Sequence, residues 1–381
     1  MTTVRERLRE QPLPGEADAA ARSWPVVEAA LADRGQPGHA GSPRRVALRL
    51  ALVAVLAAAL LAMALSPAGA AVGDWIGDRF AREERAAPAF AALPEGQPVL
   101  AISRGGAYVV RPDSTRRLGS FSQAGWSPHG LHVVGVQGRR VIAMTQAATL
   151  KWTLARPRAV HDPAWSSGDG FRVAYLEGAT LRVVVGNGDP ATDHPLGRRA
   201  AAVTPAWLPR SDRWLTYATT GGAIRTVDVD SGRALWETRV SASGETPRAL
   251  AWSSRGDRLV ALWSDSVTVL DRHGRVRRTI PLPGVARELA LHPSGDRMAV
   301  VLANRVLEIR LDRRRERVLF QGTVDGVAWS GDGRRLLMSW SDTDQWLMLG
   351  PGHRVRALHG VSRELGAAGG FPRVAGWCCP R

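Results

Sequence analysis

The stretch from Gly326 to Trp340 reads GVAWSGDGRRLLMSW, and close relatives of it recur along the chain. Each of six copies has a small residue before an apolar anchor, then a turn rich in Ser, Pro, Gly and Asp, then an apolar run. Turn residues between two β-rich runs predict a tight hairpin. The anchors are Trp126, Trp165, Trp207, Trp252, Leu291, Trp329 and, in a weaker seventh copy, Trp377.

The spacing of the anchors indicates the architecture. Successive anchors are separated by 39, 42, 45, 39, 38 and 48 residues, a period typical of β-propeller blades and of helical arrays. Farther along each repeat lies a second pair of apolar runs, clearest at Ser266–Leu270 and Val276–Ile280. Four short strands in each repeat predict a propeller blade, and the region shows no long helical period.

The two ends of the repeat region set the number of blades. Three short predicted strands precede the first anchor and lack an innermost strand: Val99–Ser103, Tyr108–Arg111 and Arg117–Ser120. The segment Arg373–Cys379, which contains Trp377, can supply that strand. We therefore predict an all-β, seven-bladed propeller over residues 98–381, with one blade built from both ends of the repeat region. Six blades is the alternative, if the last segment packs elsewhere.

A long apolar run precedes the repeats. From Leu50 to Gly73 there are 24 residues without a charge, enough for a helix to cross a hydrocarbon core of ~30 Å. We expect a cytoplasmic leader over 1–45, a transmembrane helix over 46–73, and a juxtamembrane helix and linker over 74–97. A cleaved signal peptide is the rival interpretation, but the 49 residues before the run exceed a normal charged n-region.

The flanks of this run predict its orientation. Arg44, Arg45 and Arg49 crowd its amino-terminal side, so the leader is expected in the cytoplasm and the propeller outside it, in a single-pass protein of the cell (inner) membrane. Within the leader, residues 16–34 are expected to form a short helix. The apolar side chains that fall on one face of it are Trp24, Val27 and Leu31. This helix is either a marginal surface helix or a docking site for a cytoplasmic regulator.

The phrase Ala-Trp-Ser-x-x-Gly-Asp-Arg, followed by an apolar run, resembles the repeat of TolB-type and related WD-repeat-like β-propellers over about Pro98 to Arg381. The blade-ending Trp-Asp and the Gly-His of the eukaryotic-style WD repeat do not recur, so the hydrogen-bond network of that subfamily is not expected. The layout of leader, membrane helix and propeller resembles that of membrane-anchored bacterial propeller proteins.

The composition indicates whether the chain binds nucleic acid and whether its cysteines form a disulfide. The formal charge is +16, but Lys151 is the only lysine among 51 basic residues, and we interpret the arginines as a solvated surface rather than a nucleic-acid platform. Cys378 and Cys379 are the only cysteines. Neighbours on a strand point to opposite faces, so an unstrained disulfide between them is not expected. One core cysteine and one incidental neighbour are favoured over the alternative, a redox switch.

The sequence assigns no catalytic, cofactor-binding or metal-ligating residue. The repeated anchors are expected to be core between blades because they recur in register. The remaining candidates are four less regular tryptophans, three histidines near Asp162 without a recognised metal-ligand spacing, and four scattered carboxylates. They are Trp214, Trp263, Trp340 and Trp346; His129, His132 and His161; and Glu177, Asp212, Asp257 and Asp325.

Three functions remain open at this stage. The first is a non-enzymatic scaffold that binds an envelope protein or cell-wall component, held to the lipid bilayer through 46–73. The second is an anti-sigma-like or sensor protein whose leader binds a cytoplasmic regulator through 16–34. The third, an enzyme that uses the propeller channel, ranks last because no paired acids stand out. No cofactor and no nucleic acid are expected.

Overall fold

A computed structural model describes residues 89–168, 171–241, 243–312, 316–365 and 370–379. The expected leader over 1–45, with Trp24, Val27 and Leu31, and the expected transmembrane helix over 46–73 lie outside these residues. Within the described part of the chain, no helix is long and apolar enough to cross a membrane.

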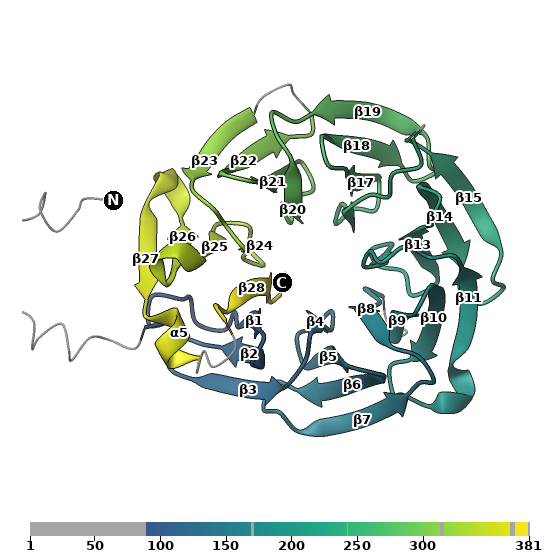
Figure 1. The fold of residues 1–381 in the computed structure, drawn as a ribbon, viewed down its shortest axis with the longest axis horizontal. Helices are drawn as coiled ribbons and strands as arrows, with labels where there is room; N and C mark the ends of the chain where they lie inside the picture. The colour runs from purple at the N-terminus through teal and green to yellow at the C-terminus, as the bar shows by residue number, and fades with distance from the viewer. Residues whose placement is uncertain (1–88, 169–170, 242, 313–315, 366–369, 380–381) are drawn as a thin grey trace, which may run out of the picture. The chain divides into compact units, whose positions relative to one another are not determined.

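Seven four-stranded antiparallel sheets surround a central opening (Figure 1). Blade 1 has β4 (Gln123–Trp126), β5 (His132–Gln137), β6 (Arg140–Thr145) and β7 (Leu150–Ala155); blade 2 has β8 (Val160–Trp165), β9 (Arg172–Glu177), β10 (Thr180–Val185) and β11 (His194–Arg198). Blade 3 has β12 (Ala206–Trp207), β13 (Trp214–Ala218), β14 (Ala223–Asp228) and β15 (Ala234–Arg239); blade 4 has β16 (Ala249–Trp252), β17 (Arg258–Leu262), β18 (Ser266–Asp271) and β19 (Val276–Pro281).

Blade 5 has β20 (Ala286–Leu291), β21 (Arg297–Leu302), β22 (Arg305–Arg310) and β23 (Glu316–Gln321); blade 6 has β24 (Gly326–Trp329), β25 (Leu336–Trp340), β26 (Gln345–Leu349) and β27 (Val355–His359). Blade 7 has β28 (Arg373–Trp377), β1 (Val99–Ser103), β2 (Gly106–Val110) and β3 (Thr115–Gly119). In the described residues the helical pieces are short: η2 (Pro190–Thr192), η3 (Ser341–Thr343), η4 (Pro351–His353) and α5 (Val361–Glu364).

The middle strands of the blades read as continuous apolar runs because neighbouring blades cover both of their faces. All five residues of β1 and of β2 are buried, whereas three of the five in the outermost strand β3 are exposed. A strand covered on both faces loses the alternation of apolar and polar residues that a half-solvated strand shows. The core is therefore a series of apolar clusters between adjacent blades.

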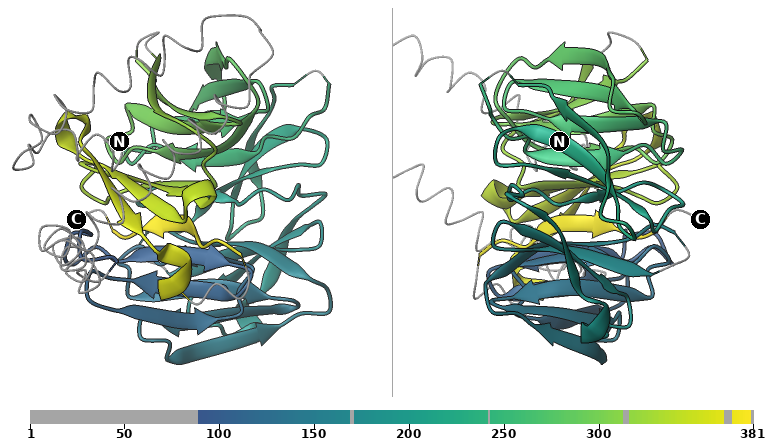
Figure 2. Two further views of the ribbon diagram at one scale, coloured as in Figure 1. Left: turned by 60° about the vertical axis from the view of Figure 1, so that its left-hand side comes forward. Right: turned by 90° about the vertical axis from the view of Figure 1, so that its right-hand side faces the viewer.

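The innermost strand of blade 7 comes from the far end of the repeat region. β28 pairs with β1 in a register that sets Val99 opposite Trp377, and Figure 2 shows the yellow β28 beside the blue strands of blade 7. The Trp377 indole Nε1 donates to the Gln97 carbonyl at 2.9 Å. The prediction of seven blades, with one closed by both ends, is confirmed, and the six-bladed alternative is excluded.

The prediction for the two cysteines holds in part: Cys378 is buried and Cys379 is half-buried, but their side chains do not point to opposite faces. β28 ends at Trp377, so Cys378 and Cys379 follow the strand and the alternation of strand side chains does not apply to them. Both sulfurs lie against Gly130, in the turn between β4 and β5, and they form a disulfide. Gly130 has a φ of 67° and its Cα faces the sulfurs, so a Cβ at this position would overlap them.

Each anchor is the last residue of an innermost strand. Three of the anchors form a hydrogen bond to the neighbouring blade through the indole nitrogen: Trp207, Trp252 and Trp329. Their Nε1 atoms donate to the Ala164 carbonyl (3.0 Å), Thr216 Oγ1 (3.0 Å) and the Ala290 carbonyl (3.1 Å), respectively. The side chains are buried at Trp165, Trp207, Trp252 and Trp377, and half-buried at Trp126, Leu291 and Trp329.

A buried serine follows four of the anchors and closes the turn after them. Its Oγ accepts a backbone N–H five or six residues later: His132 to Ser127 (3.0 Å), Arg172 to Ser166 (2.8 Å), Arg258 to Ser253 (3.1 Å) and Arg335 to Ser330 (2.9 Å). The repeated serine thus satisfies a buried donor in the tight hairpin between the first two strands of a blade.

Candidate functional site

A pocket of about 600 Å³ opens over blade 2. Its walls come from the connection after β7, the end of β9, the first half of β10, and β11 with the residue that follows it. Five of its ten lining residues are arginines: Arg156, Arg158, Arg182, Arg198 and Arg199. Gly178, with a φ of 56°, makes the tight turn that sets Glu177 opposite Thr180 at the base of the pocket. We call this feature the arginine pocket.

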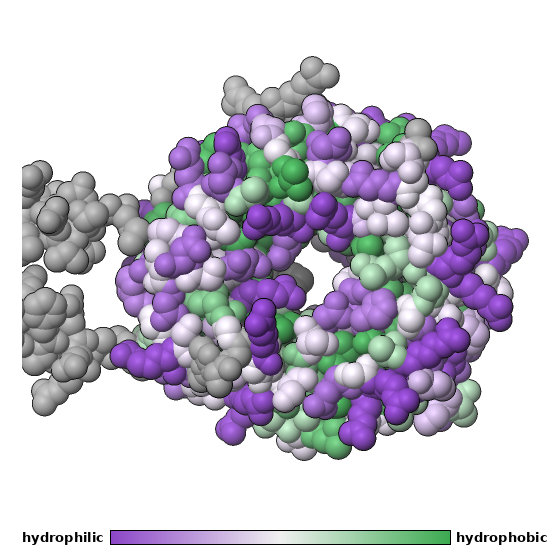
Figure 3. All heavy atoms as spheres, viewed as in Figure 1, coloured by the Kyte–Doolittle hydropathy of each residue, from purple (hydrophilic) through white to green (hydrophobic). Residues whose placement is uncertain are grey.

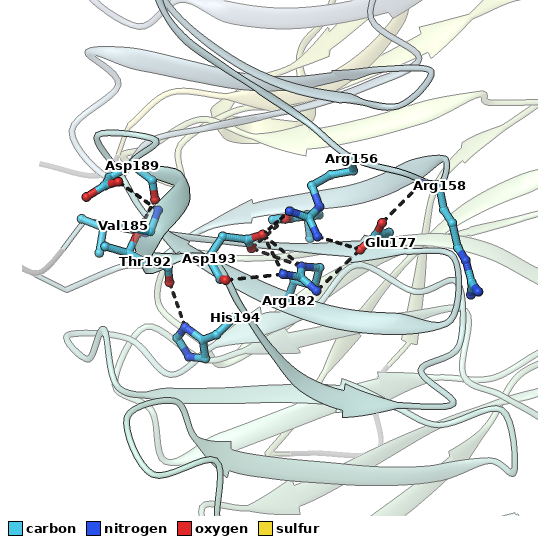
Figure 4. A network of polar contacts seen from close by, with 11 residues as sticks. Arg156, Arg158, Glu177, Arg182, Val185, Asp189, Thr192, Asp193 and His194 are labelled. Atoms are coloured by element: carbon cyan, nitrogen blue, oxygen red, sulfur yellow. Dashed lines mark hydrogen bonds and ion pairs between the residues drawn. The ribbon is translucent and has the colours of Figure 1, made fainter.

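A buried carboxylate fixes two of these arginines. Asp193 follows η2, and only 1% of its side chain is exposed. Its carboxylate accepts from Arg156 Nη1 at 2.6 Å and Arg182 Nη2 at 2.8 Å (Figure 4). It also accepts from the Tyr175 hydroxyl at 2.7 Å. Burial, together with the bond to Asp193, holds the pKa of Tyr175 far above its usual range, so the phenol keeps its proton and donates it.

Glu177 is the second acid of the cluster. Its carboxylate lies 3.2 Å from Arg156 Nη2 and 3.6 Å from Arg182 Nη1, and it accepts from the backbone N–H of Arg158 at 3.3 Å (Figure 4). Burial lowers the pKa of Arg182, but the bonds and charge of Asp193 outweigh it and the net shift is upward. Two acids therefore hold two permanently charged guanidinium groups in a fixed arrangement.

The other three arginines leave the pocket positive. Arg158, Arg198 and Arg199 are exposed, and none of them forms an ion pair with an acid among the residues that the structure describes. Five arginines against Glu177 and Asp193 give the cluster a charge of about +3. A preformed pocket with unneutralised guanidinium groups is suited to binding anions.

A second polar feature lies three residues before the anchors of the first three blades. In the first three blades this position holds Gln123, Asp162 and Thr204. Gln123 Nε2 and Thr204 Oγ1 donate to Asp162 Oδ1 at 3.2 and 2.8 Å, and the Gln123 side chain accepts from the Asp162 backbone N–H at 2.6 Å. The three blades are thus joined by a chain of hydrogen bonds, in which Asp162 is buried, Gln123 is half-buried and Thr204 is exposed. Figure 3 shows hydrophilic side chains around the central opening on the face in view.

In blade 5 the same position holds Glu288. Its Oε1 accepts from the Val327 backbone N–H of β24 at 3.4 Å. Part of the side chain reaches solvent, but protein surrounds the carboxyl. This desolvation raises the pKa of Glu288 to about 7, although the positive charge of Arg373 acts to lower it. Glu288 is therefore expected to change its protonation near neutral pH.

The histidines do not form a cluster. His161 lies between Asp162 Oδ2 (2.8 Å) and the Gly178 carbonyl (3.0 Å), and the bond to Asp162 raises its pKa. His129 lies in the turn between β4 and β5, and His132 begins β5 next to the Trp165 ring. Over the described ranges, no three His, Cys, Asp or Glu side chains are grouped as a metal site.

The four scattered carboxylates lie in four different blades. Glu177 belongs to the arginine pocket, Asp212 and Asp257 lie in the turns after Trp207 and Trp252, and Asp325 precedes β24. They therefore form no paired-acid site.

Among the less regular tryptophans, Trp263 and Trp346 are buried, while Trp214 and Trp340 are half-buried. The Arg272 guanidinium covers the Trp214 ring at 5.5 Å. The sequence interpretation missed the arginine pocket. It also missed the polar residues three positions before the anchors of blades 1, 2, 3 and 5, which the register of the repeats makes visible.

No family model matches the chain, and no curated protein does. Solved structures resemble it in fold. The β-propeller domain of Cps50 (Swd1) from Myceliophteria thermophila is 15% identical, with a TM-score of 0.52 over 63% of this chain and 86% of that one. A chain of the Mitotic Checkpoint Complex is 14% identical, with a TM-score of 0.50 over 62% of this chain and 76% of that one. These likenesses show a WD40-like propeller, while the TolB-type affiliation stays a prediction.

Proposed function

We propose that this WD40-like, seven-bladed propeller is a non-enzymatic scaffold that holds a protein partner at the arginine pocket of blade 2. The observation that carries the proposal is the excess of three exposed guanidinium groups around a pocket whose other two arginines are fixed by Asp193 and Glu177. One of the similar structures is a component of a protein complex, which supports an assembly role for a propeller of this type.

The arrangement favours association for two physical reasons. Unneutralised charges attract an oppositely charged surface over about one Debye length and raise the association rate. Arg156 and Arg182 are already held in place, so binding against them costs less side-chain entropy than binding against free arginines. Arginine is also enriched at protein interfaces because its planar group forms paired hydrogen bonds.

Photo-crosslinking in cells tests this scaffold role. A photoreactive amino acid replaces Ala179, which is exposed at the rim of the pocket, and in a matched strain it replaces Ala234, which is exposed on β15 of blade 3. We expect discrete protein adducts from position 179 and fewer or none from position 234. Equal adducts from both positions, or none from position 179, would refute a partner at the pocket.

We also propose that residues 46–73 anchor the chain in the cell membrane, with the propeller outside the cytoplasm. The support is the uncharged run from Leu50 to Gly73 and the arginines that precede it. Protease added to spheroplasts is expected to degrade the propeller, with the leader protected. Protection of both parts until the membrane is lysed would contradict this topology.

The signalling alternative rests on the apolar stripe of Trp24, Val27 and Leu31. Under this alternative, a photoreactive residue at position 24 captures a cytoplasmic regulator, and deletion of residues 1–41 abolishes the downstream response while adducts at position 179 persist. If the deletion changes neither the response nor the adducts at position 179, the leader serves insertion alone.

A further inference from the structure

We infer that the arginine pocket binds an extended acidic segment of a protein partner, with carboxylates at alternate positions along it. This inference rests on the scaffold function proposed above and adds the chemistry of the ligand.

The free positive charges lie on two sides of the hairpin between β9 and β10. The Arg158 backbone N–H is bonded to Glu177 at the end of β9, and its side chain passes Gly178. Arg198 is at the end of β11, opposite Thr180 of β10. The segment that carries Arg158 leads into β8, beside β9, so three strand spacings of ~4.8 Å separate the backbone positions that carry the charges, or ~14 Å in total.

This separation favours several carboxylates over one compact anion. A single tetrahedral oxyanion offers its charge at one point, and it would leave one side of the hairpin unneutralised. In an extended peptide, residues two apart point to the same face and lie ~6–7 Å from each other. Glu or Asp side chains at such positions can meet Arg158 on one side and Arg198 with Arg199 on the other, each through charge-assisted hydrogen bonds.

The rest of the pocket suits a peptide. The volume of about 600 Å³ exceeds that of one small anion, and Pro157, Ala179 and Pro195 provide short apolar surfaces between the arginines. Such surfaces can cover the aliphatic stems of acidic side chains while the carboxylates reach the guanidinium groups.

The test is fluorescence anisotropy with the full chain in detergent. The probe is a labelled eight-residue peptide of alternating Glu and Ser, and its neutral counterpart has Gln in place of Glu. The pocket variant is R158Q/R198Q/R199Q, and the matched control is R116Q/R233Q/R255Q, which removes three exposed arginines from blades 7, 3 and 4. Phosphate and a singly phosphorylated serine peptide serve as competitors.

We expect the Glu peptide to bind at least tenfold more weakly to the pocket variant than to the control, and binding to weaken from 0.05 to 0.3 M salt. Equal losses in both variants would show general attraction to a basic surface and would overturn the inference. Stronger competition by phosphate or the phosphoserine peptide than by unlabelled Glu peptide would overturn the choice of carboxylates. Absent peptide binding together with intact adducts at position 179 would refute the acidic ligand and leave the scaffold function standing.

Discussion

Replacing Trp252 by alanine tests the idea that the anchors hold adjacent blades together. The Trp252 side chain is 8% exposed and packs in an apolar cluster with Leu208 and Ile224 of blade 3 and Leu259 of its own blade. Truncation of a buried tryptophan to alanine costs ~3–5 kcal/mol of the free energy of unfolding, because burial is lost and a cavity remains. The hydrogen bond to Thr216 adds little, since Thr216 Oγ1 keeps its bond to Thr226.

Differential scanning calorimetry measures the effect. In a domain of this size, each kcal/mol shifts the melting temperature by roughly 2 °C, so W252A is expected to melt ~6–10 °C below the parent protein. The substitution Trp252→Phe keeps most of the packing and removes the indole donor, and a loss of ~1–2 kcal/mol is expected. A melting temperature within 2 °C of the parent for W252A would refute the role of this anchor as core between blades 3 and 4.

Three further changes follow from contacts described above. Ser253→Ala removes the acceptor of the Arg258 N–H and should lower the unfolding free energy by ~1 kcal/mol in urea titrations, whereas the exposed neighbour Ser254→Ala should be neutral. Asp193→Asn removes the negative charge that pairs with the part-buried guanidinium groups of Arg156 and Arg182, and it should lower the free energy of unfolding by ~3 kcal/mol. An unchanged urea midpoint would contradict the role of Asp193 in the pocket. Burial raises the pKa of Glu288 to about 7, above its value in the unfolded chain, so its contribution to stability is present below pH ~4.5 and is lost as pH rises through 7. Glu288→Gln should therefore raise the free energy of unfolding by ~1–2 kcal/mol relative to the parent at pH 8 and leave it unchanged at pH 4. Equal effects at both pH values would show that the titration of Glu288 is not the cause.

The fold was predictable because the anchors recur in register. The blades are marked by a tryptophan at the end of six of the seven innermost strands, with Leu291 in blade 5, and by the turn that follows most of these anchors. The predicted strands agree with the observed ones to within one or two residues, as at Ser266–Leu270 against Ser266–Asp271. The closure by β28 was predictable because one blade lacked a strand and the last anchor was unused.

The arginine pocket was not predictable from the sequence. With 50 arginines in the chain, no single one is distinctive. What separates Arg156 and Arg182 from the rest is the buried Asp193, which reaches both across blade 2 only after the strands have paired. The disulfide was missed for a similar reason, since it depends on β28 ending one residue before Cys378.

The pairing of β28 with β1 also has a consequence for biosynthesis. β1 emerges from the ribosome before all the other strands of the propeller, while its inner neighbour, residues 373–377, is made after all of them. During translation β1 therefore exposes an unpaired edge that can pair with other chains. A premature stop codon anywhere between blade 6 and residue 373 would leave that edge permanently open, so such truncated products are expected to aggregate rather than persist as smaller rings.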